Sequence, residues 1–128
     1  MLFPDNPVAS IAVYTAFAIA ALSPAFAEGD PGRGETVYRQ CAACHSFDPA
    51  DRRPGPHLQG IFGRTAGAVE GFRYSEAMAA SEIVWTGEAL SAYLLNPRAS
   101  LPGTRKPVGL RRESDIQDVL AFLRQEGG

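Results

Sequence analysis

Residues 41–45 read CAACH and contain both cysteines of the chain, Cys41 and Cys44, followed by His45. Two thiols at this spacing can form a redox disulfide, bind a metal ion, or add to the two vinyl groups of a haem, whose iron the adjacent imidazole then binds. A thioredoxin-like pair needs a βαβ pattern, which the sequence does not show, and a structural zinc ion needs four ligands. The chain offers only two cysteines and two histidines in all. The spacing therefore predicts one covalently bound haem c, held by Cys41 and Cys44, with its iron bound by His45.

The composition indicates one small exported domain. The chain has 128 residues and a net charge of -2, so it has no broad basic surface for nucleic acid. An apolar run over residues 8–22 is followed by AFA at residues 25–27, which is typical of an export signal and its cleavage site. The run is shorter than the roughly 20 residues that span a bilayer. We expect a signal peptide at 1–27, a domain at 28–128, a periplasmic or otherwise exported location, and no stable membrane insertion after cleavage.

Hydrophobic periodicity and capping residues predict four short helices after the export signal. Their expected ranges are 30–44, 74–81, 86–95 and 114–126. The expected N-caps are Asp30, Thr86 and Ser114, the last in a capping box with Gln117. The third helix is expected to end before Pro97, because the residue before a proline disfavours helical geometry.

A long stretch over residues 46–72 is rich in glycine and proline and separates the first two helices. A compact domain rarely contains so long a segment without secondary structure. The segment makes sense if it wraps a large apolar group that supplements the small core of a chain of this size. A haem attached at residues 41–45 would be such a group.

These motifs, taken together, resemble the class I c-type cytochromes of the mitochondrial kind. GETVYRQCAACHSF is similar to the family's first helix and haem attachment site. GPHLQGIFGRTAG, GFRYSEAM, IVWTGEALSAYLLNP and PGT follow in the family's order, so the resemblance covers about residues 34–124. It implies an all-α class I cytochrome c fold, with about four short helices and long loops wrapped around one covalently attached haem. It also implies that Gly34 and Tyr38 lie where the first helix crosses the last.

The resemblance assigns further residues to the haem site. The Pro56 carbonyl would accept a hydrogen bond from the ring of His45, which fixes the tautomer of a metal-binding histidine. The residues at positions that hydrogen-bond or neutralise a haem propionate are Arg64, Tyr74 and Trp85. For the two aromatic residues, a place in the apolar core is the alternative. Tyr93 would lie over the distal haem face, and His57, which replaces an asparagine of the family, is expected to be a surface or hydrogen-bonding residue.

The sequence departs from the family at the sixth iron ligand. The family's PGTKM supplies a methionine, whereas residues 102–106 read PGTRK, so that Lys106, the only lysine of the chain, stands in its place. Three possibilities remain open. The neutral amine of Lys106 binds the iron, or Lys106 points to solvent and leaves the iron five-coordinate or water-bound, or a methionine or histidine moves in after rearrangement. Among these we favour Lys106 as a metal ligand beside His45.

The implied function is that of an electron carrier, not an enzyme, which moves single electrons between respiratory or other redox complexes. The alternative is a haem protein whose labile or vacant distal site binds a small ligand or peroxide and has weak peroxidatic activity. The expected partners are redox proteins with acidic docking surfaces. The candidate arginines for a docking rim are Arg39, Arg98, Arg105, Arg111 and Arg112. Scattered solvated charge without a partner is the alternative.

Overall fold

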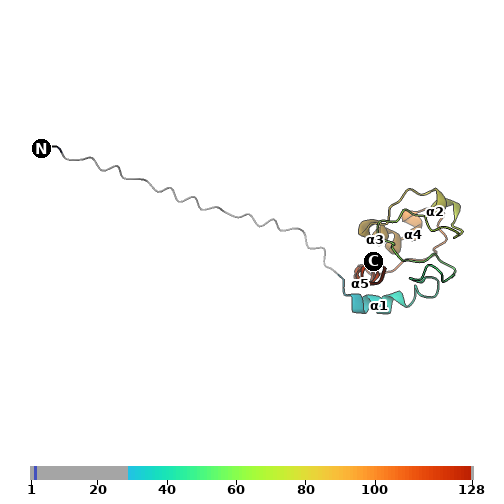
Figure 1. The fold of residues 1–128 in the computed structure, drawn as a ribbon, viewed down its shortest axis with the longest axis horizontal. Helices are drawn as coiled ribbons and strands as arrows, with labels where there is room; N and C mark the ends of the chain where they lie inside the picture. Colours follow the sequence, from blue (N-terminus) through green and yellow to red (C-terminus); the bar gives the residue numbers. More distant parts are fainter. Residues whose placement is uncertain (1, 3–28, 128) are drawn as a thin grey trace.

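The computed structural model describes Leu2 and residues 29–127, a part of the chain that forms five helices joined by long loops (Figure 1). The helices are α1 (Pro31–Tyr38), α2 (Glu76–Ala80), α3 (Gly87–Leu95), α4 (Pro97–Ser100) and α5 (Glu113–Gly127). Thr65 and Val84 form an isolated β-bridge, and this described part contains no β-strand. The all-α expectation is confirmed. Apart from Leu2, the expected export signal lies outside the described residues.

The first helix is shorter than the sequence predicted. Asp30 caps it as expected, since its carboxylate accepts a hydrogen bond from the Arg33 backbone N–H at 3.0 Å. Regular helix ends at Tyr38, and residues 39–44 continue as hydrogen-bonded turns. In these turns the backbone N–H of Cys41 donates to the Tyr38 carbonyl at 2.7 Å. Such three-residue spacing tightens the end of a helix, and it carries the chain directly into the CAACH segment.

Proline both ends one helix and opens another. α3 begins after its expected N-cap Thr86, whose side-chain oxygen accepts from the Ala89 N–H at 3.1 Å, and it ends before Pro97. Pro97 then starts α4, a helix that the sequence pattern does not predict. Asn96 caps α4 by accepting from the Ala99 N–H at 3.2 Å. A proline is tolerated in the first turn of a helix because its missing N–H would have no partner there.

The predicted capping box at the start of the last helix is wrong. α5 already includes Glu113, so Ser114 lies within the first turn and is not the N-cap. Glu113 and Asp115 place two carboxylates in this turn, where they interact favourably with the helix dipole. Asp115 also lies 3.9 Å from the Arg112 guanidinium. These charges favour a start two residues earlier than an N-cap at Ser114 would give.

The core lies where α1 crosses α5, and the two helices run next to each other in Figure 1. A Cβ atom at Gly34 would lie 1.9 Å from the Asp118 carbonyl oxygen, so only glycine permits this close approach. The rings of Tyr38 and Phe122 pack with their centroids 5.2 Å apart. The expected contact of Gly34 and Tyr38 with the last helix is confirmed. The most deeply buried side chains all come from α5 and are Ile116, Val119 and Leu120.

A buried carboxylate fastens the start of α1 to α5. Asp118 is 5% exposed, and its side chain accepts from the Asp30 backbone N–H at 2.7 Å and from the Arg33 Nε–H at 3.0 Å. The hydrogen bond from Arg33, followed by that from the Asp30 backbone, lowers the pKa of Asp118 below its usual value.

No described helix combines the length and apolar character needed to cross a membrane.

Candidate functional site

The two thiols and the imidazole lie on one turn immediately after α1. The backbone N–H groups of Cys44 and His45 both donate to the Cys41 carbonyl, at 3.0 and 2.9 Å. Cys41 is half-buried, Cys44 is exposed, and both carry free thiols. Burial raises the pKa of the Cys41 thiol, with an opposing effect from the charge of Lys106. This turn presents two unpaired thiols next to one imidazole.

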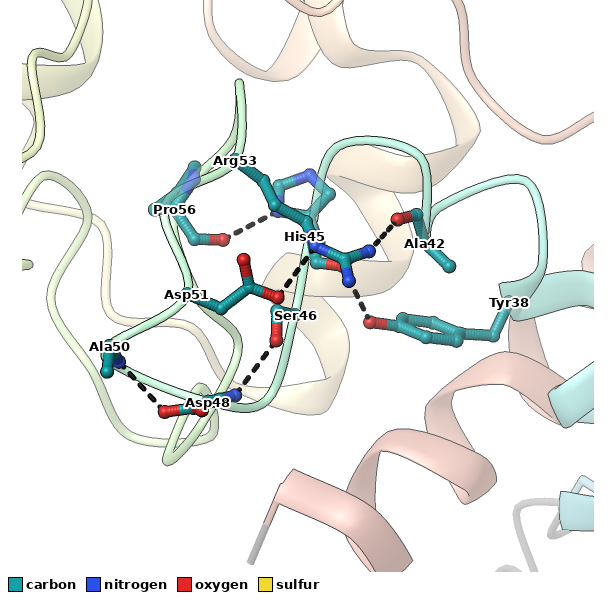
Figure 2. A network of polar contacts seen from close by, with 9 residues as sticks. All are labelled: Tyr38, Ala42, His45, Ser46, Asp48, Ala50, Asp51, Arg53 and Pro56. Carbon is teal, nitrogen blue, oxygen red and sulfur yellow. Dashed lines mark hydrogen bonds and ion pairs between the residues drawn. The ribbon is translucent and has the colours of Figure 1, made fainter.

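The His45 ring is held by the loop that follows it. Its Nδ1 atom lies 2.7 Å from the Pro56 carbonyl oxygen, to which Nδ1–H donates (Figure 2). Burial is the main effect that lowers the pKa of His45, and the charge of Lys106 adds to it, while the bond to Pro56 opposes both. A neutral ring that donates from Nδ1 keeps a lone pair on Nε2, the form that binds a metal ion. Gly55 is required here, because a Cβ atom would lie 2.5 Å from His45 Cε1.

Lys106 belongs to a loop that two hydroxyl groups organise. Its backbone N–H donates to Thr104 Oγ1 at 3.3 Å, and Thr104 Oγ1 lies 2.6 Å from the Tyr93 hydroxyl. The Lys106 side chain is half-buried, and its charge lowers the pKa of both Cys41 and His45. The fold therefore brings the only lysine of the chain within electrostatic range of the CAACH turn, from which it is distant in sequence.

Arg64 lies beside His57 and faces a cavity. Its guanidinium donates to the His57 carbonyl at 2.8 Å and to the Gln59 carbonyl, and it lies 3.3 Å from His57 Nδ1. Burial lowers the pKa of Arg64, and burial and the charge of Arg64 together lower that of His57. The cavity has a volume of about 400 Å³, and its lining includes Arg64, His57, Val69 and Glu70. A cation at such a cavity suits a carboxylate ligand.

The three aromatic residues of the predicted site are held by different contacts. The Tyr74 hydroxyl accepts from the Val69 backbone N–H at 3.0 Å. Trp85 is 6% exposed and belongs to the apolar core, which fits the alternative given above for this residue. Its ring lies 5.1 Å from that of Tyr93 between centroids. The propionate contacts expected for Tyr74 and Trp85, and the place of Tyr93 over the distal face, stay predictions.

These surroundings fit a haem. A flat apolar macrocycle would need apolar side chains to cover it, and the structure offers several that are only partly buried against the core. They include Leu58, Phe62, Met78, Ile83, Tyr93, Leu94 and Leu110. Covering such surface contributes roughly 25 cal/mol per Å². The two thiols and the free Nε2 of His45 supply attachment and iron binding, and the cavity at Arg64 suits the carboxylates of the macrocycle.

The hydrogen-bond partners of two arginines in the site were not identified from sequence. Arg53 donates to the carbonyls of Ala42 and His45, the latter at 3.3 Å, and its Nε pairs with Asp51 at 2.9 Å (Figure 2). Arg105, which the sequence analysis placed on a docking rim, donates to the backbone carbonyls of Arg73 at 3.0 Å and Tyr74 at 3.3 Å. No local pattern identifies either contact, because both partners depend on how distant loops fold together.

The chain is similar to known proteins over nearly all of the described residues. The cytochrome c family model matches residues 32–126. A cytochrome c2 from Blastochloris viridis is 41% identical over 116 residues, covering 88% of this chain and 91% of that protein. A cytochrome c2 from Rhodomicrobium vannielii is 43% identical over 106 residues, covering 81% and 85%. Among solved structures, cytochrome cH from Methylobacterium extorquens superposes with a TM-score of 0.71 and 31% identity, covering 76% of this chain and 99% of that one.

Proposed function

This chain belongs to the cytochrome c family, and we propose that Cys41 and Cys44 hold its haem through thioethers while His45 binds the iron. Members of the family carry one covalently bound haem c and pass electrons to and from redox partners, so the protein is a monohaem electron carrier and not an enzyme. The haem supplies one-electron chemistry at its iron. The observation that carries the assignment is the 2.7 Å contact between His45 Nδ1 and the Pro56 carbonyl, which leaves Nε2 free beside two unpaired thiols.

The protein's own contribution to electron transfer is to hold the iron ligands still. The bond to Pro56 fixes the tautomer and the ring plane of His45, and it raises the basicity of Nε2. The glycine at position 55 allows the loop to come this close. A ligand that keeps its geometry in both oxidation states reduces the rearrangement that accompanies each electron transfer. Arg64, Tyr74 and Trp85 would hold the haem carboxylates, with Arg64 supplying the charge.

Lys106 would be the second residue that binds the iron. Its charge acts on both Cys41 and His45, which supports a position facing the CAACH turn. The hydroxyl contacts from Tyr93 to Thr104 and from Thr104 to the Lys106 backbone would fix the loop over the distal face. Only the neutral amine has a lone pair for iron, so binding requires Lys106 to release its proton.

The finer features of location and docking rest on the sequence. Residues 1–27 would direct export and be removed, leaving the domain at 28–128 in the periplasm or another exported location. Partners with acidic surfaces would meet an exposed arginine rim. Its members are Arg39, Arg98, Arg111 and Arg112. Val108, which is 70% exposed, adds an apolar contact next to Lys106. Arg105 donates to two backbone carbonyls and therefore holds loops together.

Haem staining and redox titration test the proposal together. The wild-type protein should keep its haem after denaturing electrophoresis, because thioether bonds do not depend on the fold, and should titrate as a reversible one-electron couple. The Cys41→Ser, Cys44→Ser double variant should lose the stain. His57→Gln changes the other histidine of the chain, which lies outside the attachment motif, and should keep it. Retained covalent haem in the double variant would contradict the assignment.

A further inference from the structure

The CAACH turn ends in a series of backbone carbonyls that one loop segment satisfies. We call this segment, residues 53–58, the proximal bracket. Within it, the backbone N–H of Gly55 donates to the Cys44 carbonyl at 2.7 Å, and that of Leu58 donates to the Ser46 carbonyl at 2.8 Å. Pro56 takes the acceptor role: its carbonyl accepts a hydrogen bond from His45 Nδ1–H. Backbone carbonyls at the end of a helical turn need partners of this kind.

Arg53 donates to two further backbone carbonyls of the CAACH turn, which no backbone N–H of the bracket reaches. One guanidinium nitrogen, NH1, donates to the carbonyls of both Ala42 and His45. The His45 carbonyl also accepts from the Tyr38 hydroxyl at 3.4 Å. Figure 2 shows the guanidinium between the bracket and the CAACH turn, with the Pro56 carbonyl in contact with the His45 ring. Arg53 is thus the one side chain of the bracket bonded to the backbone of the proposed iron ligand.

The preceding loop is built to aim Arg53 at this position. Asp51 pairs with Arg53 Nε at 2.9 Å and so orients the guanidinium. Two local side-chain bonds shape the approach: the Asp48 N–H donates to Ser46 Oγ at 3.0 Å, and the Ala50 N–H donates to Asp48 Oδ1 at 2.9 Å. By contrast, no hydrogen bond or ion pair of the Arg52 side chain is found in the described part of the chain, although Arg52 carries the same charge one residue earlier.

We propose that Arg53 is a positioning residue for the proximal ligand: it holds the bracket so that the Pro56 carbonyl stays on His45 Nδ1. The inference rests on the proposed role of His45 as iron ligand. Pro56 is three residues from Arg53. Loss of the Arg53 hydrogen bonds would therefore let residues 53–58 move, and with them the Pro56 carbonyl that accepts from His45 Nδ1–H. A weaker bond at Nδ1 makes Nε2 a poorer electron donor, which favours ferrous over ferric iron.

The neighbouring arginine provides a matched control. Arg53→Ala and Arg52→Ala remove the same charge from adjacent positions, so the general electrostatic effect on the iron is similar in both. Only Arg53→Ala removes the bonds to the carbonyls of Ala42 and His45. Arg53→Lys restores the charge and one donor group, and it should recover part of the wild-type behaviour.

Two measurements on the purified holoprotein test the proposal. In the reduced protein, nuclear magnetic resonance gives the solvent exchange rate of the His45 Nδ1 proton. We expect Arg53→Ala to raise this rate on the order of tenfold, as expected for loosened support of a metal ligand, and Arg52→Ala to leave it near the wild-type value. At a fixed ambient potential, the ferrous-to-ferric ratio of Arg53→Ala should exceed that of Arg52→Ala by about twofold.

The results separate this inference from the proposed function. Equal exchange rates in Arg53→Ala and Arg52→Ala would overturn the role of Arg53, as would equal ferrous-to-ferric ratios. The proposed function is tested on the wild-type protein without any variant. If His45 binds the iron, its ring protons must give signals that ferric iron shifts strongly. Absence of these shifted signals would contradict the proposed function. If Arg53→Ala does not yield holoprotein, Arg53→Gln, which removes the charge but keeps an amide donor, is compared with Arg52→Gln by the same two criteria.

Discussion

The Tyr93 hydroxyl and Thr104 Oγ1 lie 2.6 Å apart, which joins α3 to the loop that carries Lys106. Burial raises the pKa of Tyr93, so the phenol stays protonated at neutral pH and can donate to Thr104. Thr104 Oγ1 in turn accepts from the Lys106 backbone N–H. The position of Lys106 therefore depends on a partly buried contact between two hydroxyl groups.

We expect Tyr93→Phe to loosen this loop while leaving the haem attached. Losing one net hydrogen bond costs about 1 kcal/mol, which corresponds to roughly a fivefold increase in the fraction of open loop. The rate of cyanide binding to ferric protein should rise by about the same factor. Thr104→Val removes the other partner, and the double variant should be no faster than either single one. Additive effects of the two substitutions would show that the two hydroxyls act independently.

Lys106 should control the spin state of the ferric haem. We expect low-spin iron at neutral or higher pH and a reduction potential below that of a methionine-ligated relative, since an amine is a harder donor than a thioether. As pH falls, the released amine takes up a proton and the iron becomes high spin.

Lys106→Ala should be high spin at neutral pH and bind cyanide readily, while Arg98→Ala, an exposed charge change outside the motif, should behave as wild type. Absorption and electron paramagnetic resonance spectra decide this. A wild type that is already high spin at neutral pH and matches Lys106→Ala would exclude Lys106 as a ligand.

Removal of the export signal should leave a chain that begins at Glu28. AFA at residues 25–27 ends one residue earlier, and its small residues suit the cleavage enzyme. Intact-mass analysis of the protein exported from cells gives the answer directly. Replacing Ala27 by Phe should block cleavage at this bond, while replacing Phe26 should not. A mass that retains residues 1–27 in the wild type would indicate an uncleaved anchor.

The close approach of α1 and α5 predicts a sharp difference between two glycines. A Cβ atom at Gly34 would lie 1.9 Å from the Asp118 carbonyl oxygen, which is backbone and cannot move aside cheaply. Gly34→Ala should therefore lower the free energy of unfolding by about 3 kcal/mol. At Gly32, the nearest atom is the end of the Asp30 side chain at 3.1 Å, so Gly32→Ala should be close to neutral. Denaturant unfolding of the two holoproteins gives the comparison, and equal stability would mean that the helices can separate at little cost.

What the sequence could predict is set by how local each feature is. The CAACH chemistry depends on covalent spacing, and the caps of α1 and α3 depend on residues within one turn, so Asp30 and Thr86 were identified correctly. The start of α5 was wrong by two residues because charges next to Ser114 compete with its capping pattern. The partners of Arg53 and Arg105 were missed for a different reason. Each donates to backbone carbonyls, which every residue has, so no residue type in the sequence marks the acceptor.

Asp118 should make the stability of the fold depend on pH in the acid range. Its pKa is lowered in the folded protein, chiefly by the hydrogen bond from Arg33, so the ionised carboxylate stabilises the native state above the unfolded pKa of about 3.9. This stabilisation is lost as pH falls from that value through the lower folded pKa. Asp118→Asn keeps the shape but loses the charge, and the neutral group holds the Asp30 N–H and Arg33 less well. We expect its melting temperature to be several degrees lower at neutral pH and to approach that of the wild type as pH falls through the lowered pKa of Asp118 in the folded protein. Asp115→Asn, a less buried change on the same helix, should show a much smaller difference. Thermal unfolding of the holoproteins at a series of pH values provides the test. If the difference in melting temperature between wild type and Asp118→Asn stays constant across that range, the carboxylate charge is not what fastens α1 to α5.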